Sequence, residues 1–469
     1  MRKHILYCRG YILLLVCHTP NGYDLLSRTP KSFMAMLSPA SVLPGIAVVL
    51  LLLCAGAPAQ NATLEKNAAL EKESASIADK LFAEVPFEQW LAEGQRQELS
   101  WRVSLSADQL SLHQRIVLHV HATVSAGELK KHAHLLALLR ITDANRKEFK
   151  NYGTVDTTAL DLPHLKEVTL DWSAFVLPGE YKIALALSDL SAGQHGMVLK
   201  KLHVNGLGHD PLPGIWTNLP SVEFWAPFRE FGLDQSFHSD IKGRLNLPLA
   251  TKRPVHLDVL ADVTPSELFT GHQGAYTRYL FGVLATWKDF SQIEPAGGSI
   301  NGALLDLKQQ KVIWEQKNIS TVDWAGMKNA LGEKTAGLVS AKDLQNRYNP
   351  VFLREELARR ASESTGDALH VIVLIGGPLG AYNFPRLNPI QVSNENTVIY
   401  FLQFESQEHL AGNRPISNRA ISTPVISNRP ISHMREMLSP LRVRVLRLTS
   451  AADIRRALAL IMNEIAQTQ

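Results

Sequence analysis

The sequence DVTPS at residues 262–266 carries the clearest chemical pattern in the chain. It follows the mostly apolar stretch LDVLA, so a strand is expected to deliver it into a turn. Such a turn presents one carboxylate and two hydroxyls at alternate positions, and Mg²⁺ prefers oxygen ligands in octahedral geometry. We therefore predict Asp262, Thr264 and Ser266 as ligands of Mg²⁺. The alternative is a structural turn in which Ser266 or Thr264 caps the next helix.

This pattern resembles the D-x-S-x-S metal motif of von Willebrand factor A domains, with Thr264 in place of the first serine. The resemblance covers residues 252–469 and extends to the order of the expected elements. These are a helix after the motif, a GSINGALLDL strand, an antiparallel KQQKVIWEQ strand and a final helix. The chain is similar to the secreted von Willebrand factor A-related proteins that have acidobacterial members. The resemblance implies a doubly wound α/β domain with helices on both faces of a mostly parallel sheet.

The resemblance also implies two further ligands for the metal. A threonine from a neighbouring loop is one of them, for which Thr321 and Thr335 are the candidates. An acid is expected after the strand in LHVIVLIGGPLG, where Gly376, Gly377 and Pro378 stand instead. Because that carboxylate is missing, the sequence leaves both a partial metal site and a purely structural turn open.

Other patterns suggest chemistry less strongly. The segment GGSING around Ser299 departs from the G-x-S-x-G motif of serine hydrolases at Asn301, and it precedes a strand instead of following one. Two H-x-H pairs make a zinc site conceivable, but we expect solvent-facing strand histidines at His119, His121, His132 and His134. The sequence thus offers no assembled catalytic group and no cofactor-binding motif.

The first 59 residues have the features of an export signal. An apolar run of about twelve residues, Val42–Leu53, is shorter than the roughly twenty that span a bilayer, and Ala57-Pro58-Ala59 follows it. We expect cleavage near Ala59, and the alternative is a leader anchored through Tyr11–Cys17. All 3 cysteines precede this point, so the mature chain would have no disulfide. The leader also carries the whole formal charge of +4, which argues against nucleic acid as a partner.

Changes in hydrophobic period divide the remaining chain. Residues 60–98 are rich in Ala, Glu and Lys and are expected to form a helical leader. A period of two over 99–207 predicts an antiparallel β-sandwich, and PGEYKIALALSD within it is similar to late strands of immunoglobulin-like and fibronectin-like domains. The aromatic segment 208–251 is expected to pack between domains. Residues 252–469 then alternate strands and helices around a flexible insertion at 410–436.

These observations favour a secreted or periplasmic protein without enzymatic activity that binds a protein or cell-envelope partner. The docking surface would be the loops at the carboxyl edge of the α/β sheet, where open α/β sheets usually bind ligands. This interpretation expects the strand ending at Ala261 to lie inside the sheet and its turn to reach an exposed rim. The alternatives are Mg²⁺-dependent ligand capture and a hydrolase of unknown substrate. A membrane would be contacted only through an uncleaved leader.

Overall fold

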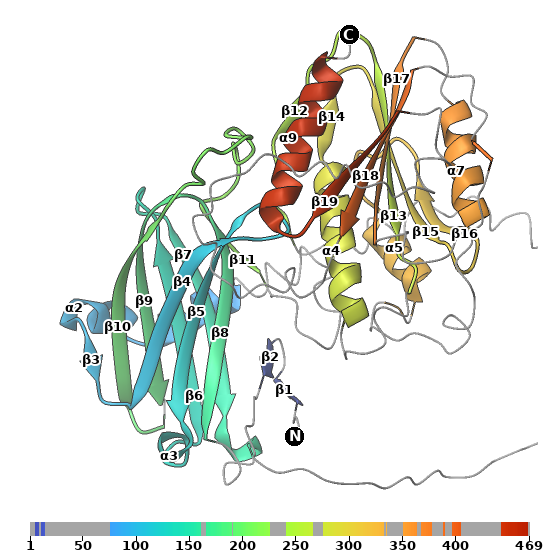
Figure 1. The fold of residues 1–469 in the computed structure, drawn as a ribbon. Helices are drawn as coiled ribbons and strands as arrows, with labels where there is room; N and C mark the ends of the chain where they lie inside the picture. Colours follow the sequence, from blue (N-terminus) through green and yellow to red (C-terminus); the bar gives the residue numbers. More distant parts are fainter. Residues whose placement is uncertain are drawn as a thin grey trace, which may run out of the picture.

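The computed structural model describes two β-rich domains that share an interface (Figure 1). The described residues are 5–8, 11–14, 76–160, 166–189, 191–225, 241–265, 275–332, 334, 350–363, 367–377, 388–389, 396–404 and 442–467. The expected cleavage point and the insertion 410–436 lie outside them. Near the start of the sequence, β1 (Ile5–Cys8) and β2 (Tyr11–Leu14) pair antiparallel. Among the described residues, no helix combines the length and apolar character needed to cross a membrane.

The N-terminal domain is a sandwich of two antiparallel sheets. The five-stranded sheet has the order β3-β10-β9-β6-β7 and the four-stranded sheet the order β11-β8-β5-β4. Alternate residues of both sheets point inward and form one buried core, as the period of two predicted. The strands are β3 (Arg96–Gln97), β4 (Trp101–Leu110), β5 (Ile116–Ser125), β6 (His134–Thr142), β7 (Glu148–Asp156), β8 (Glu167–Val176), β9 (Gly179–Asp189), β10 (Gln194–Val204) and β11 (Val222–Trp225).

Helices cover the outer face of the five-stranded sheet. Residues 76–84 are helical and α2 (Phe87–Glu93) follows them. Phe82, Phe87 and Trp90 pack with Leu138 and other side chains of the sheet in a separate buried cluster. The described part of the expected helical leader is therefore a layer of the sandwich and not a free spacer, because its apolar stripe has a sheet face to cover.

The C-terminal domain is built on a six-stranded sheet with the order β16-β15-β13-β17-β18-β19. Every neighbouring pair is parallel except β15 with the edge strand β16, which is antiparallel. As expected, β13 lies inside the sheet, between β15 and β17. The strands are β13 (Val255–Asp262), β15 (Ser299–Asp306), β16 (Lys311–Gln316), β17 (Leu369–Gly376), β18 (Thr397–Phe404) and β19 (Arg442–Leu448).

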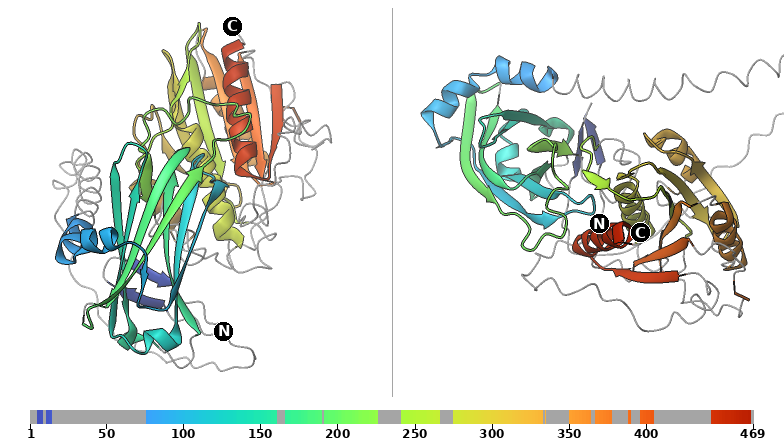
Figure 2. Two further views of the ribbon diagram at one scale, coloured as in Figure 1. Left: turned by 90° about the vertical axis from the view of Figure 1, so that its left-hand side faces the viewer. Right: turned by 90° about the horizontal axis from the view of Figure 1, so that it is seen from above.

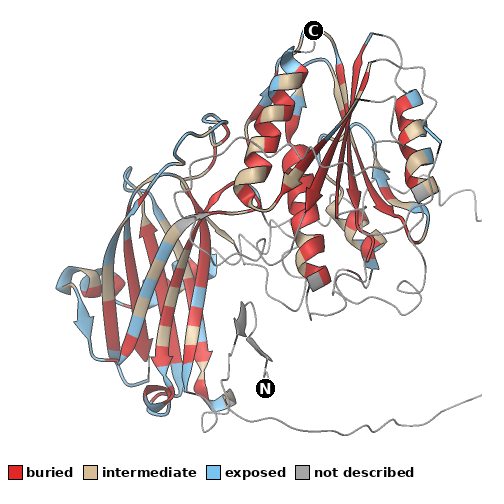
Figure 3. Ribbon diagram, viewed as in Figure 1, coloured by how far each residue is buried: buried red, intermediate tan, exposed pale blue. Residues whose placement is uncertain are grey.

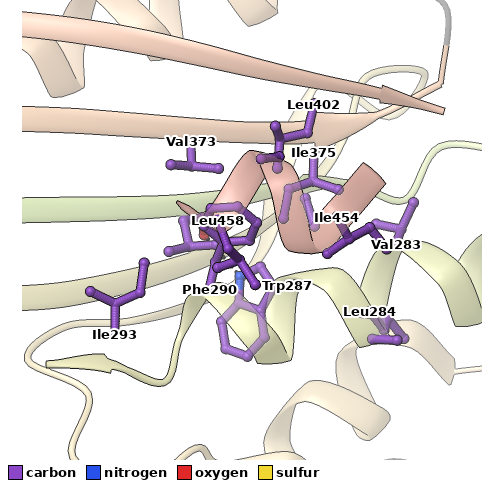
Figure 4. Close-up of a cluster of buried hydrophobic side chains, with 14 of the residues drawn as sticks. Val283, Leu284, Trp287, Phe290, Ile293, Val373, Ile375, Leu402, Ile454 and Leu458 are labelled. Carbon is purple, nitrogen blue, oxygen red and sulfur yellow. Dashed lines mark hydrogen bonds between the residues drawn. The ribbon is translucent and has the colours of Figure 1, made fainter. Parts of the chain in front are cut away.

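Helices lie on both faces of this sheet (Figures 1 and 2). One face packs against α4 (Ala275–Phe290), α5 (Trp324–Leu331) and α9 (Ala451–Gln467), and the other against α7 (Pro350–Glu363). The inner strands are consequently buried along their length (Figure 3). Trp287 of α4 belongs to the larger cluster, together with Phe290 of the same helix and Leu458 of α9 (Figure 4).

The segment between the domains contributes a strand to each of them. β11 extends the four-stranded sheet of the sandwich, whereas β12 (Leu247–Leu249) pairs parallel with β14 (Ile293–Pro295) of the α/β domain. Trp216 packs against the cores of both domains, as expected for the aromatic residues of this segment. Phe228, Phe231 and Phe237 lie outside the described residues.

The hairpin between β4 and β5 forms the joint between the domains. Its tip, residues 111–115, leaves the sandwich and packs against α4 and α9. Gln114 Nε2 donates to the carbonyl oxygen of Ala451 at 3.1 Å, and Trp216 Nε1 donates to the carbonyl oxygen of Gln114 at 2.7 Å. Because His113, Gln114 and Arg115 are all at most 3% exposed, this tip is an interior part of the molecule.

Candidate functional site

The turn after β13 is held by its own hydrogen bonds. The backbone N–H of Thr264 donates to Asp262 Oδ1 at 3.0 Å, and the Thr264 hydroxyl donates to the same oxygen. Thr264 Oγ1 in turn accepts from the backbone N–H of Leu307 at 2.8 Å, beyond the end of β15. The two predicted ligands therefore meet as partners of each other, and the hydroxyl ties the ends of two strands together.

The turn is buried, which is a correction of the expected exposed rim. Asp262 and Thr264 are each 1% exposed, and Val263 is fully buried. The tyrosines of α4 cover them, with Tyr276 Oη donating to the carbonyl oxygen of Val263 and Tyr279 Oη to that of Asp262, both at 2.8 Å. The prediction was wrong because the exposure of a turn depends on the helix that returns over it, which the motif itself does not specify.

Tyr279 also connects the turn to the neighbouring strand. The backbone N–H of Gly377 donates to Tyr279 Oη at 2.8 Å. A Cβ atom on Gly376 would lie only 3.0 Å from Asp262 Cβ, so the glycine permits β13 and β17 to end close together. At these two strands the order of the sheet reverses, which is where open α/β sheets usually bind ligands.

A buried ion pair lies at the same edge of the sheet and was not predicted. Asp306, the last residue of β15, is fully buried and forms an ion pair with Lys334, which follows α5. The other carboxylate oxygen of Asp306 accepts from the backbone N–H groups of Lys308 and Gln309 at 3.1 and 2.9 Å. The ammonium group of Lys334 thus neutralises the carboxylate of Asp306, which lies near Asp262 along this edge of the sheet.

Of the three predicted metal ligands, Asp262 and Thr264 lie together at this edge of the sheet within the described residues. Oδ1 of Asp262 and the hydroxyl of Thr264 already bond to each other, and no group of three or more His, Cys, Asp or Glu that could hold a metal ion occurs in the described part of the chain. Ser266, Thr335 and Pro378 lie outside the described residues. Thr321 lies at the opposite end of the sheet, because the nearby Ile319 N–H donates to the carbonyl oxygen of Ile300 near the start of β15.

Replacing Thr264 by valine tests whether this turn is structural. Valine keeps the shape but leaves the buried Leu307 N–H without its acceptor, so we expect the free energy of unfolding to fall by about 1–3 kcal/mol in urea. Thr123→Val is the matched control, because Thr123 pairs with Thr169 on the partly exposed sandwich face and should cost less than about 0.5 kcal/mol. A loss with Thr264→Val that appears only when Mg²⁺ is present would instead identify the hydroxyl as a ligand.

A second polar cluster lies on the α7 face, at the amino end of the sheet. His370 Nε2 lies 3.0 Å from Asp258 Oδ2, and Asn301 Nδ2 donates to Asp258 Oδ1 at 2.8 Å. Arg360 of α7 adds its charge, 3.7 Å from Asp258 Oδ2. Burial alone would raise the pKa of Asp258, but the bonds from His370 and Asn301 and the charge of Arg360 outweigh it and lower that pKa. Asp258 is therefore a buried carboxylate that links neighbouring strands.

Ser299 forms a hydrogen bond with a histidine at the same end of the sheet. His256 Nδ1 lies 2.7 Å from Ser299 Oγ, since the two residues are opposite each other in the register of β13 and β15. Within the described residues, no carboxylate pairs with His256. The nucleophile, base and orienting acid of a serine hydrolase are thus not assembled here.

The H-x-H histidines of the sandwich lie in two separate places and bond to different partners, with His119 and His121 on β5, His134 at the start of β6 and His132 just before that strand. His119 Nδ1 lies 3.0 Å from Ser173 Oγ, and His121 Nδ1 lies 2.5 Å from Asp171 Oδ1, on the outward face of β5. His134 is an exposed strand residue near Asp156. His132 is only 5% exposed and lies 2.7 Å from Asp189, so its predicted solvent exposure was wrong. The two pairs do not converge on one site.

Comparisons with known proteins give no relative. No protein-family model matches the chain, and no curated protein matches it. Among solved structures, a glycosyl hydrolase family 2 member from Bacteroides cellulosilyticus is 12% identical over 26% of this chain and 16% of its own, with a TM-score of 0.16. The Parabacteroides merdae β-glucuronidase is 10% identical over 64% of this chain and 33% of its own, with a TM-score of 0.17. A structural genomics target is 18% identical over 24% of this chain and 92% of its own, with a TM-score of 0.16. The chain spans about a sixth of the first of these structures, and similarities at these TM-scores carry no argument about function.

Proposed function

We propose that the chain is an exported interaction protein that binds a protein or cell-envelope partner through the carboxyl edge of its α/β sheet. The observation that supports this most is the reversal of strand order at β13 and β17, whose carboxyl ends meet at Asp262 and Gly376. The buried turn serves as a scaffold in this proposal. The surface that docks is made by the segments that leave this edge, and the partner does not reach Asp262 itself.

A relationship to von Willebrand factor A domains is part of the proposal. It is supported by the acidic residue at the end of an inner strand, by the helix α4 that follows, and by the antiparallel edge strand β16. The burial of Asp262 and Thr264 favours a metal-independent form of binding, because a metal that captures a partner needs an open coordination position. Mg²⁺-dependent capture is the alternative that the experiment below separates.

Photocrosslinking from the two ends of one strand tests the proposal. Gln310 precedes β16 at the carboxyl edge and Lys317 follows β16 at the opposite edge, and both are exposed. The full chain would carry p-benzoylphenylalanine in place of either residue and be irradiated in envelope extract, with and without EDTA. We expect a crosslinked product from position 310, none from position 317, and the same yield with EDTA.

Two results would contradict the proposal in different ways. If EDTA abolishes the crosslinked product, the partner is bound by Mg²⁺-dependent capture and not by metal-independent contacts. Equal yields from both positions, or no product from position 310, would remove the carboxyl edge as the docking surface.

A further inference from the structure

His119 and His121 form a pair of imidazole rings on the outer face of β5. Leu118, Val120 and Ala122 alternate with them and belong to the core of the sandwich, so both histidines point away from that core. The two rings lie almost parallel, with 6.0 Å between their centres and an angle of 14° between their planes. Two imidazoles are thus presented side by side on a half-exposed surface.

Each ring is held in place through its Nδ1 atom. His121 Nδ1 lies 2.5 Å from Asp171 Oδ1 and His119 Nδ1 lies 3.0 Å from Ser173 Oγ, because these residues are opposite each other in the register of β5 and β8. A carboxylate can only accept, so Nδ1 of His121 carries a proton and the lone pair of the neutral ring lies on Nε2. Metal-binding histidines are usually oriented in this way.

The Nε2 atoms of both rings face solvent. In the described part of the chain neither has a hydrogen-bond partner, and neither is among the buried atoms that lack one. Ser106 and Ser104 of β4 are opposite His119 and His121 on the other side of β5, so no cationic side chain lies directly beside the rings. The surroundings of the pair are therefore open to a cation.

The separation of the rings suits a single metal ion. A metal–nitrogen bond of about 2.0–2.1 Å places the centre of a ligating ring about 3 Å from the ion, so two rings can share one ion with their centres about 5–6 Å apart. The observed separation of 6.0 Å is compatible with this after a modest rotation of the rings.

We propose that His119 and His121 bind one transition-metal ion through Nε2, with Ser173 and Asp171 holding the rings. Imidazole ligands suit Cu²⁺, Ni²⁺ and Zn²⁺, and Cu²⁺ forms the most stable complexes of these ions. Two protein ligands leave the other coordination positions to water or to a group of a second molecule. The site lies on the sandwich, whereas the docking edge belongs to the α/β domain, so this inference is independent of the proposed function.

A titration of the full chain with Cu²⁺ iminodiacetate tests the pair directly. This complex leaves coordination positions for two imidazoles, and the 3 cysteines of the chain would first be blocked with iodoacetamide. The hydrogen bond to Asp171 raises the pKa of His121, so the titration is run at pH about 8, where imidazoles are largely neutral. We expect one equivalent to bind and to shift the electron paramagnetic resonance spectrum from that of the free complex.

Variants of the sandwich separate this site from nonspecific binding. His119→Gln and His121→Gln each leave a single imidazole, so the affinity should fall by at least about tenfold. Asp171→Asn should weaken binding by about 10–100-fold, the range for residues that orient a metal ligand. His134→Gln is the matched control, because His134 is an exposed strand histidine whose H-x-H neighbour, His132, is buried. This variant should bind the complex as the wild type does.

Three results would overturn the proposal: no binding by the wild type, equal binding by the wild type and both single-histidine variants, or an equal loss in His134→Gln. Unchanged affinity of Asp171→Asn would contradict the role of the carboxylate in holding the ring. None of the four replaced side chains is buried, so each variant should keep the circular dichroism spectrum of the wild type. A loss of binding with that spectrum unchanged reports on the site and not on folding.

Discussion

Replacing Arg360 by methionine is expected to lower the free energy of unfolding by about 3–5 kcal/mol, the range for breaking a buried ion pair from one side. The guanidinium is 1% exposed and connects α7 to the sheet, with Nε donating to Glu356 at 2.7 Å and Nη2 to Glu315 at 2.8 Å. It also lies 3.7 Å from Asp258. Methionine fills a similar volume but leaves the carboxylates of Asp258 and Glu356 without this cation.

The neighbouring arginine provides a matched control. Arg359 pairs with Glu356 and Glu363 on the same helix, but its side chain is 43% exposed. Arg359→Met should change the free energy of unfolding by no more than about 1 kcal/mol, as for other exposed pairs. Guanidinium titrations of both variants, followed by circular dichroism, measure the difference. Equal losses would mean that burial of the network under α7 does not determine its contribution.

The inner strands of the α/β sheet could be predicted from their sequences. Leu369–Gly376 and Thr397–Phe404 are largely apolar on both faces, and such runs suit a sheet that helices cover on both sides. Val255–Asp262 is apolar on the face toward α4, whereas its other face carries His256 and Asp258. The edge strand Lys311–Gln316 is more polar and pairs antiparallel, as the resemblance implied. In these strands the residue pattern agrees with the observed burial, because a strand covered on both faces needs apolar side chains at successive positions.

The environment of the candidate site could be predicted only in part. The position of Asp306 could have been predicted from the sequence. Neighbouring parallel strands end at the same edge of a sheet, so the acidic residue at the end of β15 must lie near the one at the end of β13. The position of its partner Lys334 could not, since no local pattern connects a lysine after α5 to the end of another strand. The burial of Asp262 likewise depends on Tyr279, which is distant in sequence and comes back over the turn from α4.

The joint between the domains could also be predicted only in part. The crowded aromatic residues before β12 correctly predicted packing between two domains, and Trp216 does contact both cores. The hairpin tip that carries Gln114 has the polar composition of an ordinary exposed turn, yet it is buried. The tip is buried because it packs against α4 and α9. The residue pattern of the hairpin itself gives no sign of that contact.

Replacing Arg455 by methionine is expected to lower the free energy of unfolding by about 3–5 kcal/mol and to weaken the coupling between the two domains. Arg455 is 2% exposed and donates from Nε and Nη2 to the two carboxylate oxygens of Asp210, both at 2.6 Å. It also donates to the carbonyl oxygen of Leu212 at 3.1 Å, and its guanidinium stacks 4.6 Å from the ring centre of Trp216. A methionine retains some packing against the ring but none of the hydrogen bonds, so the segment between the domains loses its main attachment to α9.

Arg456→Met is the control on the adjacent residue, because Arg456 pairs within its own helix with Asp453 and has 19% of its side chain exposed. It should cost no more than about 1 kcal/mol. Differential scanning calorimetry of the full chain distinguishes the two variants, since loss of the joint should divide a shared transition into two, one for each domain. A single unchanged transition with Arg455→Met would contradict a role of this arginine in the joint. Two transitions with Arg456→Met would show that the effect belongs to α9 as a whole, because both residues lie on that helix and only Arg455 contacts the connecting segment.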